Sequence, residues 1–356
     1  MAPRRWTDWW RAPWWLLALA TGAKSFADNP LLGSRALNAR GLHAARVRLA
    51  HRLTVRRRRW LAPSVPTAWR EAFDRDGFVV IPGVLAAAEL AEVQRALATQ
   101  PLPTRAHLQG DTITARVLFD HDAGRRLPAL ERLLRRPEVR ALFSYAAGTL
   151  TPPIHYLQTI LGGAAPGDLP DPQVHLHADA FYPSMKAWLF LADVAEDGRP
   201  LTYVAGSHRL TAERLAWEQA RSLTVLEHGD RLSQRGSLRV EREELAGLGL
   251  PEPTRFAVPA NTLLVADMFG FHARGDSDRP TTRVELWSYN RRPPFLPDLG
   301  RRLLALAPRS WAGGGVVYRA TDLLDRLGLR RQHWHDIGPQ PPAAPDLRGR
   351  APETLL

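Results

Sequence analysis

The stretch His175-Leu-His177-Ala-Asp179-Ala-Phe-Tyr-Pro183 decides the fold. It places His177 and Asp179 two positions apart, within a region whose apolar pattern predicts strands. Side chains on a strand alternate between its two faces, so residues i and i+2 point the same way. We therefore expect His177 and Asp179 to share one face of a β-strand, from which both could chelate one ion.

A second polar stretch, Asp267-Met-Phe-Gly-Phe-His272-Ala-Arg, follows about 95 residues later. One His-x-Asp pair and one distant histidine form the 2-His-1-carboxylate pattern, which is typical of non-haem iron(II) sites. Three such ligands occupy one face of an octahedron and leave the remaining positions open. The sequence therefore predicts a catalytic metal site made of His177, Asp179 and His272.

Other histidines beside acidic residues have the wrong spacing for this set. His175 has a histidine, not a carboxylate, two residues after it. His121-Asp122 and His333-Trp-His335-Asp336 place histidine directly beside a carboxylate. Because a buried histidine is more often a core residue than a ligand, we interpret these groups as structural.

Arg283 is the candidate for binding a cosubstrate. It follows His272 by eleven residues, at the start of the strand-like stretch 282–289. Arginine binds carboxylates through two hydrogen bonds, and a keto-diacid chelated to a metal at one end needs such a partner at the other. Arg274 and Arg279 are alternatives, but they lie in the predicted turn before that strand.

Apolar patterns and turn residues predict a mainly β domain with flanking helices. Strands are predicted at 78–81, 188–194, 256–258, 262–266 and 282–289. Helices are predicted at 69–76, 86–99, within 128–147 and within 300–330. We place this domain at 66–338, with a helical insertion at 211–250. The tail at 339–356 is rich in Pro, Ala and Arg, and we expect it to be loosely ordered.

Charge divides the chain into two unequal parts. The whole chain has a formal net charge of +12. Residues 1–65 hold 13 Lys or Arg against two acids, and the rest of the chain is nearly neutral. The same arm holds six of the 12 tryptophans. There are no cysteines, which excludes disulfides, thiolate metal sites and a cysteine nucleophile.

This arm is expected to lie on an anionic membrane surface through residues 1–60. Its apolar run at 12–20 is too short to span a bilayer, and it fits a cleaved signal poorly. Further on, one helical face is apolar and is surrounded by arginines, which suits an interfacial helix. That face consists of Leu42, Ala45, Leu49, Leu53 and Trp60. One alternative is a helix packed on the domain with solvated arginines. Another is nucleic-acid binding through Arg56–Arg59, which we do not expect.

With these motifs in hand, the chain resembles the phytanoyl-CoA dioxygenase family over roughly residues 68–292. The resemblance begins with Phe-Asp-Arg-Asp-Gly-Phe-Val-Val-Ile-Pro-Gly-Val-Leu at 73–85 and includes His177-Ala-Asp179. It continues through Trp188 to Val194 and Gly-Arg-Pro-Leu-Thr-Tyr-Val-Ala-Gly-Ser-His-Arg at 198–209. It closes with His272 and Arg283. The combination is far more specific than any single piece.

The resemblance implies a double-stranded β-helix, the jelly-roll or cupin-like core, with Fe(II), 2-oxoglutarate and O2 as cofactors. It implies that Arg283 binds the 2-oxoglutarate carboxylate and that Trp188 lies beside the cosubstrate. Related halogenases lack the carboxylate ligand, so the presence of Asp179 favours hydroxylation of an unactivated C–H bond.

We expect a small-molecule or lipid substrate, and our hypothesis is a lipid or lipid-linked molecule at an inner-membrane surface. The expected location is cytoplasmic, with a peripheral position on the inner membrane as part of that hypothesis. The main alternative is a catalytically silent jelly-roll binding protein recruited to membranes. A further alternative is an oxygenase that acts on nucleic acid or protein. The sequence does not indicate the oligomeric state.

Overall fold

The computed structural model describes residues 12–164, 171–296, 298, 315–329, 332–343, 345 and 347. Its strands are β1 (Phe78–Ile81), β2 (Leu102–Gln109), β3 (Thr112–Leu118), β4 (Ile154–Gly162), β5 (Met185–Phe190), β6 (Leu201–Tyr203), β7 (Thr254–Arg255), β8 (Thr262–Asp267), β9 (His272–Arg274), β10 (Thr281–Asn290) and β11 (His335–Gln340). Its helices are α1 (Ala12–Leu19), α2 (Arg35–Ala39), α3 (Leu42–Leu61), α4 (Thr67–Asp76), α5 (Ala87–Thr99), α6 (His121–Arg126), α7 (Pro128–Arg135), α8 (Pro137–Ala147), α9 (Ala212–His228), α10 (Arg231–Gln234), α11 (Arg242–Gly247) and α13 (Gly315–Arg326), with a 3-10 turn η2 (Ala62–Ser64).

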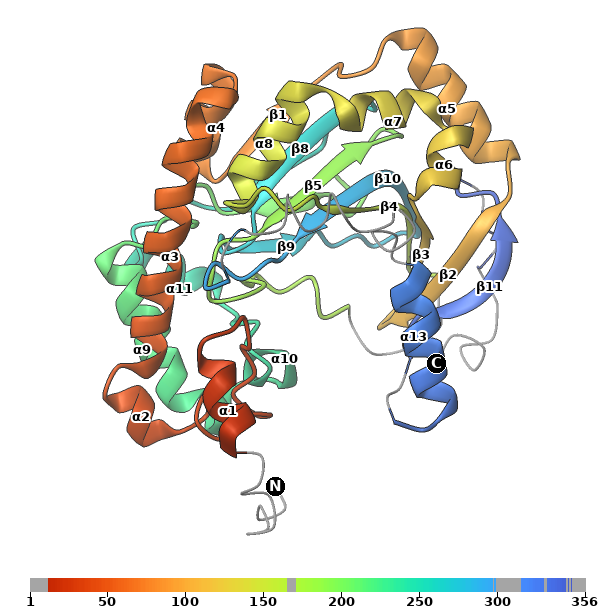
Figure 1. Cartoon of the computed structure of the whole chain (residues 1–356). Helices are drawn as coiled ribbons and strands as arrows, with labels where there is room; N and C mark the ends of the chain where they lie inside the picture. Colours follow the sequence, from red (N-terminus) through yellow and green to blue (C-terminus); the bar gives the residue numbers. More distant parts are fainter. Residues whose placement is uncertain are drawn as a thin grey trace.

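A large antiparallel sheet forms the centre of the molecule (Figure 1). Its strand order is β1-β8-β5-β10-β4-β3-β2-β11, and a smaller sheet has the order β7-β6-β9. Strand β5 shows why the large sheet is buried on both faces: Ala187 and Leu189 join one apolar cluster, whereas Trp188 and Phe190 join another. This period-two alternation is the geometry of a strand with two covered faces.

Each face of the large sheet has its own core. On the outer face, α4, α5, α7 and α8 cover the sheet (Figure 1), and Leu130 and Leu142 are fully buried there. On the inner face, Tyr203 of β6 packs with Trp188 and Leu264 of the large sheet, so this cluster joins the two sheets. The predicted fold, mainly antiparallel β with flanking helices in a jelly-roll-type core, is confirmed.

The His-x-Asp stretch differs from the prediction in its backbone. His177 forms a single antiparallel bridge with His272, and each residue's N–H donates to the other's carbonyl at 3.0 Å. The chain bends directly after it, so Asp179 lies outside any regular strand. The expectation that His177 and Asp179 share one strand face was therefore wrong. They converge through a bend at the edge of the small sheet.

Helix α3 packs on the rest of the chain through a face that mixes polar and apolar residues. It contacts α9 and α8, and its buried residues are His43, Ala44, Arg46, Val47, Ala50, His51, Thr54 and Leu61. The apolar stripe picked out by the sequence pattern faces outward instead: the side chain of Leu49 is 49% exposed and that of Trp60 is 68% exposed. The helix is therefore packed, but its inner arginines are buried and not solvated.

Several element boundaries differ from the predicted ones. The strand expected at 188–194 is β5, which begins at Met185 and ends at Phe190. Helices α9, α10 and α11 lie within 211–250. Residues 300–314 and most of the tail after 343 lie outside the described residues. Among the described helices, none combines the length and apolar character that crossing a bilayer requires.

Candidate metal centre

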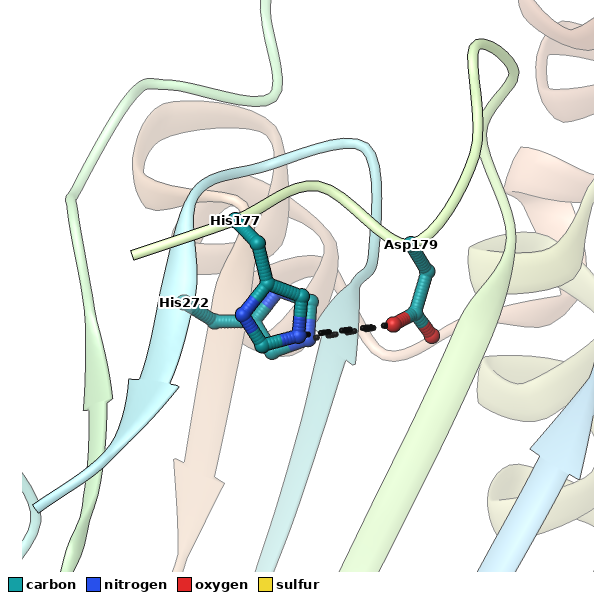
Figure 2. A group of neighbouring side chains, drawn as sticks. All are labelled: His177, Asp179 and His272. Carbon is teal, nitrogen blue, oxygen red and sulfur yellow. Dashed lines mark ion pairs between the residues drawn. The ribbon is translucent and has the colours of Figure 1, made fainter. Parts of the chain in front are cut away.

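Three side chains converge between the bend after His177 and the start of β9 (Figure 2). One donor atom from each of His177, Asp179 and His272 lies within 4.8 Å of the other two, and all three residues are buried. Asp179 Oδ1 lies 3.8 Å from His177 Nε2 and 3.5 Å from His272 Nε2. Among the described residues, this is the group whose His and acidic donors could hold a metal ion.

The histidine hydrogen bonds orient both rings for ligation. His177 Nδ1 lies 2.7 Å from the carbonyl of His175, and His272 Nδ1 lies 3.0 Å from the carbonyl of Gly270. A carbonyl can only accept, so each Nδ1 carries the proton and each Nε2 presents a lone pair to the site. His272 Nε2 is buried without a hydrogen-bond partner among the described residues. An unpartnered lone pair there fits a metal ligand.

Electrostatics keep this donor set in its ligating protonation state. Burial lowers the pKa of His177 well below its usual value, and the neighbouring His272 adds to this. Burial opposes ionisation of Asp179, but Lys186 and Arg291 outweigh it and hold the pKa of that carboxyl well below its usual range. His177 and Asp179 therefore offer a neutral imidazole and a carboxylate at neutral pH, which suits iron(II).

The second oxygen of Asp179 is held by cations. Lys186 Nζ lies 2.8 Å from Asp179 Oδ2, and Arg291 Nη2 lies 3.0 Å from the same atom. Lys24 donates to the backbone carbonyl of Asp179. These contacts leave Oδ1 as the oxygen that faces the two histidines, so they orient the carboxylate toward the metal position.

A cavity of about 420 Å³ opens beside the three donors. Its lining includes Arg283 and Trp188, as predicted for the cosubstrate, together with Arg116 of β3. Both predicted residues are buried, on β10 and β5 of the large sheet. The structure thus brings Trp188 and Arg283 together with the metal-binding candidates.

The two rival arginines are engaged elsewhere. Arg274 also lines the cavity, but it forms a buried ion pair with Asp171. Arg279 lies at the surface and pairs with Asp197. Arg283 is the one of the three whose ion pair is formed on its own strand, inside the cavity wall.

Arg283 belongs to a buried chain of hydrogen bonds. Its Nε donates to Glu285 Oε2 at 2.8 Å, and its Nη1 donates to the carbonyl of Arg199 at 2.7 Å. Glu285 Oε1 accepts from Gln158 Nε2 at 2.6 Å, and Gln158 Oε1 accepts from Arg116 Nε at 2.6 Å. This series of hydrogen bonds runs across β10, β4 and β3. It therefore fixes Arg283 and Arg116 relative to the candidate metal ligands.

The groups set aside in the sequence do not join this site. His175 is exposed and contributes only its carbonyl. His121 begins the surface helix α6, and His335 begins the edge strand β11.

The residues that sequence reasoning missed are the cations on Asp179: Lys24, Lys186 and Arg291. The sequence did mark two of them: Lys24 and Lys186 are its only lysines, beside 46 arginines. A residue type that is so rare in the chain could have singled out these two positions.

An antiparallel two-sheet fold with a 2-His-1-carboxylate cluster and an arginine in one cavity defines the non-haem iron, 2-oxoglutarate-dependent class of enzymes. Residues 73–232 match the phytanoyl-CoA dioxygenase family model. The match includes His177 and Asp179 and ends before His272 and Arg283. It confirms the resemblance expected from the sequence, the enzyme class, and iron, 2-oxoglutarate and O2 as the cofactors of that class.

Comparison with solved structures finds several to which the chain is similar. The epimerase SnoN in complex with Fe3+, alpha ketoglutarate and nogalamycin RO is 23% identical, over 62% of this chain and 81% of that chain, with a TM-score of 0.40. HygX from Streptomyces hygroscopicus with nickel and 2-oxoglutarate bound is 18% identical, over 63% and 86%, with a TM-score of 0.40. The carbocyclase SnoK from nogalamycin biosynthesis is 16% identical, over 69% and 93%, with a TM-score of 0.37. No curated protein matches the chain.

Proposed function

We propose that the chain is a hydroxylase in which His177, Asp179 and His272 hold Fe(II). Arg283 binds the distal carboxylate of 2-oxoglutarate, and Trp188 forms the wall beside it. The observation that carries this proposal is the donor set itself: both imidazoles have their protons fixed on Nδ1, and one carboxylate oxygen lies 3.8 and 3.5 Å from their Nε2 atoms.

Iron(II) and 2-oxoglutarate together supply O2 activation, with decarboxylation of the keto acid to succinate and oxidation of a substrate C–H bond. The protein's part is to bind and orient. Lys186 and Arg291 fix the Asp179 carboxylate, and Glu285 fixes the guanidinium of Arg283. The buried Trp188 keeps one side of the cavity free of water.

The test is an anaerobic titration with iron(II) and 2-oxoglutarate, which follows the weak visible charge-transfer band of the chelate. We expect the band in wild type, no band in His177→Ala, and a band that needs at least tenfold more 2-oxoglutarate in Arg283→Ala. Arg279→Ala is the matched control, because Arg279 is exposed and pairs with Asp197. A folded wild type without a band would contradict the proposal and favour the catalytically silent binding protein.

We also propose that the arm docks on an anionic membrane surface at the cytoplasmic side, where the substrate is a lipid or lipid-linked molecule. Two exposed apolar regions support this. On α1, Trp14 is 65% exposed and Leu16 and Leu17 are exposed beside it. On α3, Leu49 and Trp60 lie on one helical face among exposed arginines. Tryptophan and arginine together suit the headgroup zone.

The test is flotation with vesicles that contain anionic lipid, using Leu49→Glu/Trp60→Glu. We expect this variant to lose most vesicle binding at unchanged thermal stability. Leu323→Glu on α13 is the control, because Leu323 is equally exposed but distant in sequence from the arm. Equal flotation of wild type, the double variant and the control variant would contradict the membrane proposal. The enzyme class does not depend on this result.

A further inference from the structure

The only two lysines of the chain meet at the metal-binding candidate Asp179. Lys24 comes from the arm, in the segment between α1 and α2, and Lys186 comes from β5. Lys24 donates to the backbone carbonyl of Asp179, and Lys186 donates to its carboxylate. Both line the cavity. A lysine ammonium is a compact point charge, so two of them fit beside one residue where two guanidinium groups would crowd.

Arg116 adds a third cation, and an aromatic cage holds it. Its guanidinium carbon lies 4.3 Å from the ring centre of Trp287 and 4.2 Å from that of Trp334. Its Nε donates to Gln158, but no carboxylate among the described residues pairs with it. Burial lowers the pKa of Arg116 to about 10, and repulsion from Arg291 contributes. A rigid cation without a counter-ion in a cavity wall is suited to bind an anion.

The charges around the cavity do not balance. Three lining arginines have acidic partners other than Asp179: Arg274 with Asp171, Arg283 with Glu285, and Arg239 with Asp230. The lining cations left over are Lys24, Arg116, Lys186 and Arg291. Among the described lining residues, Asp179 is the sole carboxylate that faces them.

Cofactor binding would not remove this excess. A divalent metal ion on Asp179 adds more positive charge than the carboxylate carries. The two carboxylates of 2-oxoglutarate would be taken up by the metal and by Arg283. Buried charges without partners are costly, so a further anion in the cavity would stabilise the loaded site.

We propose that the substrate carries an oxyanion, a carboxylate or a phosphate, which Arg116 and Lys24 bind beside the metal. This rests on the proposed function, because the site is the cavity of the same oxygenase. Both residues act in binding and specificity: they select substrates with a negative group and fix the distance from that group to the oxidised carbon. Lys24 lies outside the residues that match the family, so the arm supplies one of the two cations.

The experiment is calorimetric titration of the full chain, loaded anaerobically with iron(II) and 2-oxoglutarate and also metal-free. The probes are benzoate, phenyl phosphate and neutral benzamide, whose rings suit the tryptophan walls, and dihexanoyl phosphatidic acid. We expect an anionic probe to bind at least tenfold tighter than benzamide. Binding that is tightest for phosphatidic acid assigns the oxyanion to a lipid headgroup, and binding that is tightest for benzoate or phenyl phosphate assigns it to a soluble molecule.

The variants separate this proposal from the enzyme proposal. Arg116→Gln and Lys24→Gln should each raise the Kd of the anionic probe about tenfold. Arg116→Lys should recover part of the lost affinity. The Kd for 2-oxoglutarate, from the chelate band, should change less than the Kd for the anionic probe, because Arg283 and the three candidate metal ligands are kept. Arg279→Gln is the control. Equal binding of benzamide and benzoate, or a loss of 2-oxoglutarate affinity in place of probe affinity, overturns the proposal. If the chelate band is missing but the protein still prefers the anionic probes, only the enzyme proposal is overturned.

Discussion

Arg58 of α3 forms an ion pair with Asp267, at 2.7 Å between Nη2 and Oδ2, and Asp267 is completely buried at the end of β8. The same Nη2 also donates to the carbonyl of Ala146. Asp267 lies five residues before the candidate metal ligand His272, at the start of the turn that leads to it. The arm is therefore part of the core that supports the site, whatever its exposed face binds.

We predict that Arg58→Ala lowers the free energy of unfolding by about 3–5 kcal/mol, because it leaves the carboxylate of Asp267 buried without its cation. Denaturant unfolding of the apo protein measures this. The control is Arg59→Ala, an exposed neighbour on the same helix, which should change stability by no more than about 0.5 kcal/mol. Similar losses for the two variants would contradict the role given to the ion pair.

The ion pair of Arg58 rules out removal of the whole arm as a test of membrane binding. A truncated chain that begins at Pro66 would lack Arg58, so a loss of vesicle binding could simply reflect misfolding. Point changes on the outer face of α3 avoid this problem, because Leu49 and Trp60 are exposed.

Arg46 holds residues 19–24, the segment that contains Lys24, in place through hydrogen bonds. Its guanidinium donates to the carbonyls of Leu19, Thr21 and Ala23, at 2.8–3.0 Å, and it lies over the ring of Phe181. We predict that Arg46→Met costs about 1.5–3 kcal/mol of stability, the range for a charged hydrogen-bonding group. Amide hydrogen exchange over 19–24 should rise at least tenfold, and exchange in the large sheet should change far less.

Arg48→Met is the matched control for this experiment, because Arg48 is exposed on the same helix. If exchange at 19–24 rose equally in both variants, the segment would be held by something other than Arg46.

Local patterns explain what could be predicted. Helix α4 and strand β1 were found because Gly77, with a φ of +85°, ends the helix in the left-handed region that suits glycine. Strand β8 contains the apolar run Leu263–Ala266, which its burial on both faces requires. These features depend on neighbouring residues only.

The rest depended on distant contacts. Helix α3 buries His43 against Glu218 of α9 and Arg46 against backbone carbonyls, beside the small apolar residues Val47 and Ala50, so its inner face is mixed. Apolar periodicity assumes an apolar inner face and selected the outer one. Likewise, His177 pairs with Arg239 and His272, both distant in sequence, and no local pattern shows these pairings. Strands β2 and β3 were not predicted at all.

Glu285 balances the charge of Arg283 in the absence of cosubstrate. We predict that Glu285→Gln lowers apo stability by about 3 kcal/mol, because the guanidinium then lacks its buried counter-ion. A bound carboxylate would replace that counter-ion, so 2-oxoglutarate should raise the Tm of the variant more than that of wild type. Thermal unfolding with and without 2-oxoglutarate measures both effects, and equal shifts would show that Arg283 does not receive the cosubstrate.

Stability should fall with acid because buried histidines stay neutral in the folded chain. Burial lowers the pKa of His208 to about 4, and burial likewise lowers that of His155 to about 4. The unfolded chain takes up protons at about pH 6.5 and the folded chain does not. Each histidine's contribution is therefore complete above pH 6.5 and is lost as the pH falls toward 4, with a slope of up to about 1.4 kcal/mol per pH unit.

The test of this pH dependence is His208→Gln, followed by denaturant unfolding of apo protein from pH 7.5 to 4.5. The variant loses packing at every pH, but its stability should fall less steeply, by about 1 kcal/mol per pH unit near pH 5. His228→Gln is the control, because His228 is exposed at the end of α9 and should leave the slope unchanged. An unchanged slope in His208→Gln would mean that His208 is protonated in the folded chain.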